Sequence, residues 1–419
     1  MGLNRLFFLG LIAGGILPAE DKADLQIVNR IKAEAFENSR VMDHAWYLTD
    51  VYGPRMTNTP GFTAAAEWAA KTLTGYGLSK VNLEKWGPYG RGWSYSRFSA
   101  HLTEPQYAPL IGFPLAWSSG TQGVVTGEPT LALIQSEGDF ARWRGTLKGR
   151  IAFLDAVRDL PLMTTPAAKR YSDAELVERG AAPDPGAPAA APNAALRKLR
   201  EKIREFLIHE QVAVAVQSGR GDGGTIFGQS AGTREKKDAI AVPTVVLSPE
   251  HYNRIARLLQ KKIPVRLEFD IRTQLHEEAA DSFNVIAEIP GGRKNDEVVM
   301  LGAHLDSWQG GTGATDNAAG CAVVMEAARI LKALNLKLDR TVRVALWGGE
   351  ETGMLGSKAY VRQHFANVET MQVLAEHAKL AAYFNLDNGT GKIRGIYLQN
   401  NDMVRPIFQA WLAPFHDLG

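Results

Sequence analysis

The last third of the chain alternates between short apolar runs and longer segments with helical spacing. Residues 297–302, 341–347 and 380–386 are mostly apolar and contain the β-branched and aromatic residues that are typical of buried strands. The segments between them, residues 318–334 and 354–365, have the apolar spacing of helices. This alternation predicts an α/β fold in which a mostly parallel central sheet is flanked by helices.

The middle of the chain has a different pattern. Short strands are expected at residues 149–155, 212–217, 242–247 and 265–271. Residues 249–260 have a helical pattern and precede the last of these strands. We therefore predict a small β-rich domain over residues 116–275, inserted into the larger domain. The larger domain then consists of residues 25–115 and residues 276–419.

Local signals predict five further features in the larger domain. Residues 64–73 are Ala-rich and should form a helix, and residues 81–86 alternate like a strand. The Gly-rich segment 87–93 is expected to be a flexible, exposed loop without a role, with the lining of a pocket as the alternative. Residues 393–398 are read as one more strand, followed by a helix that ends near residue 412.

The N-terminus has the pattern of a secretory signal peptide, which we place at residues 1–19. A basic residue at Arg5 precedes an apolar run over residues 6–17, and a small residue follows at Ala19. The run is too short to span a bilayer comfortably, although an uncleaved N-terminal anchor is the alternative. No later stretch has the length and apolarity of a membrane span. The sequence thus predicts a secreted or periplasmic protein.

Composition is that of an ordinary globular protein, with 45% hydrophobic and 22% charged residues. The net charge of +2 gives no electrostatic reason to expect nucleic acid or an anionic membrane as a partner. Cys321 is the single cysteine, so an intrachain disulfide is excluded. It lies among alanines and valines, and we expect it to be a buried, unreactive residue.

Potential metal ligands follow the predicted strands of the last third. His304 comes directly after the first strand, and Asp306 is placed to accept the N–H of its imidazole and fix the tautomer. Asp316 follows a Gly-rich loop and precedes a helix, where an aspartate can also be a simple N-cap. Either role is open for this residue taken alone.

Two further strand ends carry carboxylates. Glu350 and Glu351 follow the second strand and would repel each other unless a cation or a proton separates their roles. Asp387 follows the third strand, in a segment where an aspartate can also form a turn. Because parallel strands present their carboxyl ends at one edge of a sheet, we expect His304, Glu350, Glu351 and Asp387 to meet there.

Imidazole and carboxylate ligands without a thiolate favour zinc, with manganese or cobalt as alternatives. Two such ions polarise a substrate carbonyl and lower the pKa of a water to about 7. A nearby glutamate can then take the proton of that water and return it to the departing amine. The predicted reaction is hydrolysis of an amide or peptide bond.

The strand-end motifs resemble those of the co-catalytic zinc exopeptidases, which include bacterial leucyl aminopeptidase and glutamate carboxypeptidase. The resemblance lies in residues 304–308, 314–320, 346–353 and 385–389, and it is strongest to the plasma glutamate carboxypeptidase branch. Residues 149–155 and 242–248 are similar to parts of a protease-associated domain.

The resemblance assigns a role to each matching residue. It implies that His304 and Asp387 hold one metal, that Asp316 bridges two metals, and that Glu351 binds the second. Glu350 is then the general base. The family often has a cis peptide bond after the bridging aspartate, here Asp316–Asn317.

The family pattern also requires a last histidine ligand, well downstream of the position of Asp387. Only His416 follows in this sequence. We expect the true ligand to lie beyond Gly419, with His416 as the alternative, so that the peptidase part is truncated and the second metal site incomplete. On this reading the second metal binds weakly in this chain.

The leading hypothesis is an exopeptidase that acts on a peptide or dipeptide, either as an aminopeptidase or as a dipeptidase or carboxypeptidase. One alternative is a catalytically silent binding protein with the same fold, although such a protein has no use for a proton-transferring Glu350. Another is an amide transferase or cyclase with a single zinc. A homodimer is compatible with the sequence.

Overall fold

The computed structural model describes residues 23–166, 168–181, 194–387, 389, 391–399 and 401–418. The predicted signal peptide at residues 1–19 lies outside this part of the chain. Two compact units are present: the first combines residues 1–39 with 390–419, and the second spans residues 40–389. No helix in the described ranges has the length and apolarity needed to cross a membrane.

The first unit is helical in its described part. It contains α1 (Leu25–Glu37), η5 (Asp402–Val404), α10 (Arg405–Leu412) and η6 (Ala413–Leu418). Lys32 of α1 donates a hydrogen bond to the carbonyl of Pro414 (2.7 Å) and forms an ion pair with Asp417 (2.7 Å). The predicted helix ending near residue 412 is confirmed. The predicted strand at residues 393–398 is wrong, because this segment pairs with no strand and exposes Ile393.

The second unit contains a five-stranded sheet in the order β1-β11-β13-β12-β16. Its strands are β1 (Ser79–Trp86), β11 (Ser282–Ile289), β12 (Lys294–His304), β13 (Arg340–Trp347) and β16 (Leu380–Asn385). The α/β class is confirmed, but the sheet is mixed. β12 pairs in parallel with both β13 and β16, whereas β11 pairs antiparallel with β1 and β13. The parallel half is the half that carries the predicted ligands.

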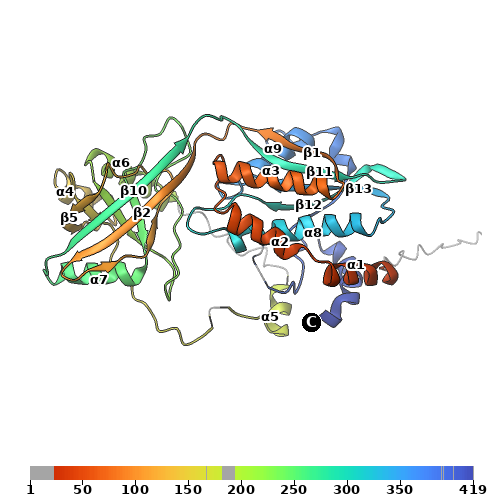
Figure 1. Ribbon diagram of the computed structural model, residues 1–419, viewed down its shortest axis with the longest axis horizontal. Coiled ribbons are helices and arrows are strands. Elements are labelled where there is room, and N and C mark those ends of the chain that lie inside the picture. The colour runs from red at the N-terminus through yellow and green to blue at the C-terminus, as the bar shows by residue number, and fades with distance from the viewer. Residues whose placement is uncertain are drawn as a thin grey trace, which may run out of the picture. The chain divides into compact units, whose positions relative to one another are not determined.

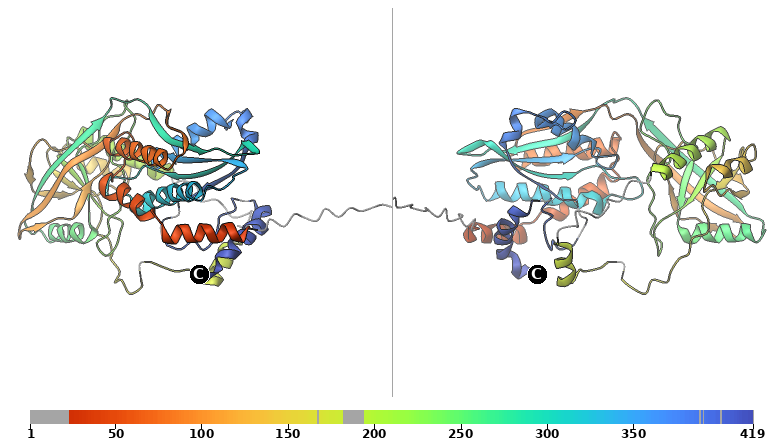
Figure 2. Two further views of the ribbon diagram at one scale, coloured as in Figure 1. Left: turned by 45° about the vertical axis from the view of Figure 1, so that its right-hand side comes forward. Right: turned by 180° about the vertical axis from the view of Figure 1, so that it is seen from behind.

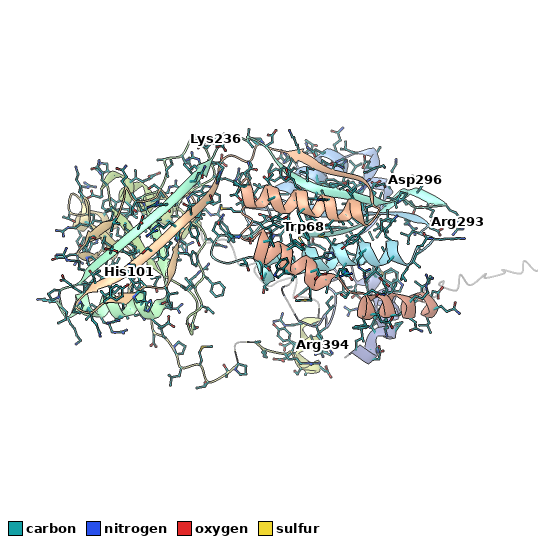
Figure 3. All side chains as sticks on the ribbon, in the orientation of Figure 1. Trp68, His101, Lys236, Arg293, Asp296 and Arg394 are labelled. Carbon is teal, nitrogen blue, oxygen red and sulfur yellow. The ribbon has the colours of Figure 1, made fainter. Side chains whose placement is uncertain are left out.

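Helices cover both faces of this sheet (Figure 1). Alternate residues of each strand point to opposite faces, so Val344 joins α3 (Pro60–Gly75) and α8 (Ala319–Ala333) in one core, whereas Ala345 joins α9 (Leu355–His364) in another. The predicted helices at 64–73, 318–334 and 354–365 are thereby confirmed. α2 (Val41–Trp46) and the π-helical turn η1 (Tyr47–Val51) precede α3. Trp68 of α3, which is labelled in Figure 3, stacks on Tyr47 with ring centroids 5.1 Å apart. The short elements β14 (Ala366–Asn367), β15 (Gln372–Val373) and η4 (Ala375–Lys379) follow α9.

A second lobe is built from two smaller sheets. Its elements are β2 (Gly92–Glu104), β3 (Ala108–Pro109), β4 (Gly112–Pro114), β5 (Val125–Gly127), β6 (Pro129–Leu131), η2 (Glu137–Asp139), α4 (Phe140–Trp143), β7 (Ile151–Phe153), α6 (Ala194–His209), β8 (Val214–Ser218), β9 (Thr244–Leu247), α7 (Pro249–Gln260) and β10 (Arg266–His276). The sheets have the orders β3-β2-β10-β5 and β4-β9-β8-β7-β6. A further helix, α5 (Asp173–Arg179), lies in the segment between β7 and α6.

The second lobe starts earlier in the chain than the predicted insertion at residues 116–275. β2 pairs antiparallel with β10 from Gly92 to Glu104, and the two strands run side by side in Figures 1 and 2. Leu102 of β2 is fully buried in the same core as Phe153 and Phe269. Strand pairing and core packing therefore both assign residue 92 onward to this lobe. The domain division itself stays a prediction.

The segment 87–93 is not the exposed loop that the sequence predicted. Tyr89 and Trp93 are fully buried, and Arg91 is nearly so. The backbone of Tyr89 hydrogen-bonds to Ala280, and Trp93 donates its indole N–H to the carbonyl of Ser118 (2.7 Å). These partners lie far along the chain, so the local glycine content gave the wrong prediction.

Candidate metal centre

The parallel strands bring the predicted ligands to one edge of the sheet. β12 ends at His304, whose register partner on β13 is Trp347, and Gly302 of β12 pairs with Asn385 of β16. The loops that carry Glu350 and Asp387 therefore begin beside His304. We call residues 305–313, which follow His304 and end three residues before Asp316, the ligand loop.

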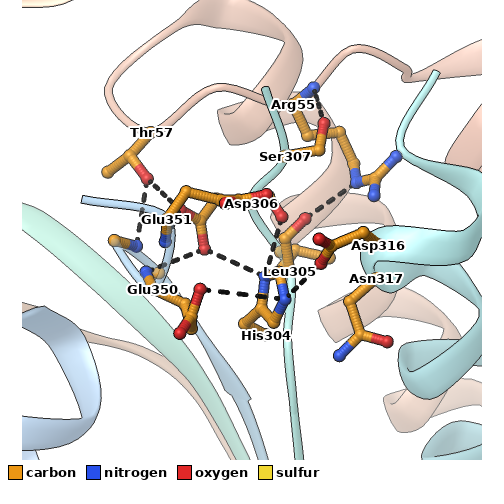
Figure 4. A network of polar contacts seen from close by, with 12 residues as sticks. Arg55, Thr57, His304, Leu305, Asp306, Ser307, Asp316, Asn317, Glu350 and Glu351 are labelled. Atoms are coloured by element: carbon orange, nitrogen blue, oxygen red, sulfur yellow. Dashed lines mark hydrogen bonds and ion pairs between the residues drawn. The ribbon is translucent and has the colours of Figure 1, made fainter. Parts of the chain in front are cut away.

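His304 is the centre of the arrangement (Figure 4). Its side chain is 2% exposed, and its Nε2 lies 2.9 Å from Oδ1 of Asp316, 3.1 Å from Oδ1 of Asp387 and 4.0 Å from Oε2 of Glu350. The ligand atoms of His304, Asp316 and Glu351 all lie within 4.8 Å of one another. The structure thus brings all five predicted residues together.

The buried Cys321 lies behind His304. Its side chain is fully buried, as predicted, and its thiol donates a hydrogen bond to the carbonyl of His304 (3.0 Å). It therefore helps to hold the end of β12 and is not available as a nucleophile.

Asp316 stands where the chain enters α8. The peptide bond Asp316–Asn317 is cis, as the family resemblance implied. Asn317 donates its side-chain amide to the carbonyl of Leu386 (2.9 Å), one residue before Asp387. This bond ties the Asp316 segment to the end of β16, so the spacing of Asp316 and Asp387 is fixed across two elements.

Asp306 has a wider role than the sequence indicated. His304 Nδ1 lies 2.9 Å from the backbone carbonyl of Asp306 and 3.6 Å from its carboxylate, so the nearer partner is the carbonyl rather than the predicted carboxylate. The carboxylate instead accepts hydrogen bonds from the hydroxyl of Thr57 (3.0 Å) and from the amides of Glu350 (3.1 Å) and Glu351 (3.3 Å). Asp306 therefore positions the loop that carries both glutamates.

That loop is a tight turn after β13. Gly349 has φ +72, and a Cβ atom there would lie 2.7 Å from Trp86. A left-handed conformation and the lack of space both require glycine at this position. The amide of Gly349 also donates to the hydroxyl of Thr57 (3.0 Å), which extends the network that holds the turn.

The charge balance of the site favours a cation. Burial raises the pKa of Glu350 and Asp387 and raises the pKa of Glu351 to about 8. Burial opposes protonation of His304, but the surrounding carboxylates of Asp306, Asp316 and Asp387 outweigh it and raise its pKa to about 12. So many carboxylates around one imidazole form an excess of negative charge that a divalent ion can neutralise. The donor set therefore fits zinc.

The ligand loop is held from both sides, which the sequence did not reveal. On one side, the fully buried Arg55 contacts its backbone. On the other, Gln309 donates to the carbonyl of Trp93 in the second lobe (3.1 Å), and Trp308 packs edge-on against Trp117 with ring centroids 5.9 Å apart. Residues 53–61 contain the glycines and prolines of a turn, and nothing in this local pattern indicates a hydrogen-bond partner 250 residues away.

Comparisons with known proteins agree with this geometry. Residues 284–416 match the model described as Peptidase family M28. Carboxypeptidase Q of Mus musculus is 26% identical over 388 residues, covering 91% of this chain and 72% of that protein. Probable leucine aminopeptidase 2 of Arthroderma benhamiae is 42% identical over 139 residues, covering 32% of this chain and 26% of that protein.

Solved structures also match. The crystal structure of a peptidase M28 precursor from Shewanella amazonensis aligns with a TM-score of 0.62 and 25% identity, covering 92% of this chain and 80% of that chain. The family match spans His304, Asp316, Glu350, Glu351 and Asp387. The motifs, the fold and the site geometry all agree with the match of residues 284–416 to peptidase family M28.

Proposed function

We propose that the protein hydrolyses a peptide bond at the end of a short peptide, with two zinc ions held at the edge formed by β12, β13 and β16. The observation that carries this proposal is the convergence of four carboxylates on the imidazole of His304 at that edge. His304 and Asp387 would hold one ion, Glu351 would hold the second, and the carboxylate of Asp316 would contribute to both. When bound, the ions supply a Lewis acid that polarises the scissile carbonyl and acidifies a water molecule.

Glu350 is the proposed general base. Its carboxylate lies 4.0 Å from His304 Nε2 and accepts no hydrogen bond from the described residues. Burial raises its pKa, which makes it a better proton acceptor than an ordinary glutamate. It takes a proton from the attacking water and passes it to the nitrogen of the leaving group. The carboxylate of Asp306 holds the backbone of Glu350 in place, because it accepts hydrogen bonds from the amides of Glu350 and Glu351.

The direct test is Glu350→Gln. We expect kcat to fall by about 100-fold or more, because general base catalysis contributes about 10²–10⁴-fold. Zinc content, measured by mass spectrometry of the purified protein, should not change. Glu67→Gln, on the exposed side of α3, is the matched control and should retain activity. Undiminished hydrolysis by Glu350→Gln would refute the assignment.

Which end of the peptide is attacked can be measured with blocked substrates. An aminopeptidase requires a free α-amino group, so N-acetylated dipeptides should resist it, whereas a carboxypeptidase should reject dipeptides that carry a C-terminal amide. The zinc stoichiometry of the same preparation distinguishes a two-ion peptidase from a single-zinc transferase. Zinc binding without hydrolysis of either substrate set would favour the silent binding protein.

Three further features of the protein are proposed with this function. The second lobe is a protease-associated-like insertion, supported by its separate sheets and its core around Phe153 and Phe269. Export through the N-terminal segment predicts a mature protein that starts near residue 20, which N-terminal sequencing would measure. Homodimer formation is measurable by light scattering after size-exclusion chromatography.

A further inference from the structure

Arg55 is a buried arginine whose guanidinium reaches both ends of the ligand loop. It lies between η1 and α3 and is fully buried. Its Nε donates to the carbonyl of Leu305 (2.8 Å), while its Nη atoms donate to the carbonyls of Thr312 (2.8 Å) and Gly313 (3.0 Å). Leu305 directly follows His304, and Gly313 lies three residues before Asp316. One rigid side chain therefore spans the segment between two ligands.

The backbone of Arg55 holds the middle of the same loop. Its amide donates to Oγ of Ser307 (3.0 Å), and its carbonyl accepts from the amide of Ser307 (3.1 Å). Ser307 is 1% exposed, so these bonds are shielded from water. The loop is thus fixed at its start, its middle and its end by one residue, and Figure 4 shows the contacts with Leu305 and Ser307.

The charge of Arg55 has no direct ion-pair partner among the described residues. Backbone carbonyls satisfy its donors, and one of its Nη atoms also reaches the carbonyl of Leu48 (2.5 Å). A buried cation that is held by carbonyls is costly for the fold, and its retention next to the ligands is best explained by the site.

We propose that Arg55 is a positioning residue that sets the separation of His304 and Asp316, and through it the metal affinity of the site. The inference rests on the proposed function. Lysine cannot replace it, because one ammonium group cannot donate along three directions over the width of a guanidinium fork.

The experiment compares Arg55→Lys with wild-type protein. Metal-free protein is titrated with zinc against a chelator of known affinity, and the visible spectrum of the cobalt(II) form is recorded. We expect zinc affinity to fall about 10- to 100-fold, as for other residues that orient metal ligands, and the cobalt bands to change in position or intensity. Arg343→Lys is the matched control, since Arg343 is a largely buried arginine on β13 that binds Glu288 and Tyr360. It should leave the cobalt spectrum unchanged.

Ser307→Ala decides the question if Arg55→Lys does not fold, as judged by circular dichroism. It removes the hydroxyl oxygen that accepts the hydrogen bond of the Arg55 amide and should lower zinc affinity by about fivefold. Wild-type affinity and an unchanged cobalt spectrum in the folded variants overturn the role of Arg55 but leave the proposed function standing. Wild-type protein that binds zinc but hydrolyses no peptide refutes the proposed function alone. Wild-type protein that binds neither ion refutes both.

Discussion

Replacing Asp306 by asparagine changes one oxygen of a fully buried carboxylate into an amide nitrogen. In the structure, one carboxylate oxygen accepts from the amide of Glu350, and the other accepts from the amide of Glu351 and the hydroxyl of Thr57. The one remaining oxygen of an asparagine can accept from the amide of Glu351 and the hydroxyl of Thr57 only if the NH₂ group points toward the amide of Glu350. That position then has two donors facing each other and no acceptor.

The expected decrease in stability follows from the loss of this one hydrogen bond. One hydrogen bond to a charged acceptor contributes about 1.5–3 kcal/mol, and the free energy of unfolding of Asp306→Asn should fall by about that amount. The turn that carries Glu350 and Glu351 then loses part of its support, so zinc affinity should fall about 10- to 100-fold. Asp296→Asn, at an exposed position on β12 (Figure 3), should change neither quantity.

The assay is urea unfolding of the metal-free protein, followed by zinc titration of the same preparation. Unfolding measures the lost hydrogen bond, and the titration measures its effect on the ligands. An Asp306→Asn variant with wild-type stability and wild-type zinc affinity would show that the buried carboxylate does not hold the turn. A loss of stability without a loss of affinity would show that the turn is supported in another way.

Three further outcomes can be measured by unfolding. Burial lowers the pKa of His44 below its ordinary value of 6.5, so the unfolded state binds more protons as pH falls through 6.5. The contribution of His44 to the free energy of unfolding should therefore be lost as the pH falls from 7.5 to 5.5, so the difference in stability between wild-type protein and His44→Gln should decrease over this range. Gly349→Ala should lower stability by about 1–3 kcal/mol, because φ +72 and the contact with Trp86 both disfavour a Cβ atom. Gly123→Ala has a similar φ of +83 but open space, and it should cost less. Free zinc at 100 times its Kd should stabilise the fold by about 2.7 kcal/mol, and a chelator should reverse the shift in Tm. A melting temperature that does not respond to zinc or chelator would contradict the proposed metal centre.

The predictions that succeeded depend on local sequence. The runs that became β12, β13 and β16 are apolar enough to be recognised alone, and each is followed directly by its ligand. Once the strands are parallel, their ends must meet, so the convergence on His304 follows from the chain order. The buried Cys321 was predicted for the same reason, from its apolar neighbours.

The predictions that failed depend on distant partners. Whether β11 pairs parallel or antiparallel with β13 is decided by tertiary packing, which an apolar run does not encode. The segment 87–93 is glycine-rich and locally turn-like, yet packing with Met56 and Trp117 buries Trp93. Arg55 has a charged side chain in a turn, and only its partners in the ligand loop explain its burial.

The pairing of β2 with β10 has a consequence for how the second lobe could be exchanged. Gly92 is the register partner of His276, so the chain leaves and re-enters the main domain at two adjacent points. Because the entry and exit points are neighbours, the block of sequence between them can be removed or replaced without displacing the strands of the main domain. The lobe is nevertheless not independent of the main domain, because its removal would expose the apolar side chains of Met56 and Trp308, which pack with Trp117, to solvent. A swap between relatives should therefore transfer the whole block from residue 92 to 276 and match the surface around Trp308.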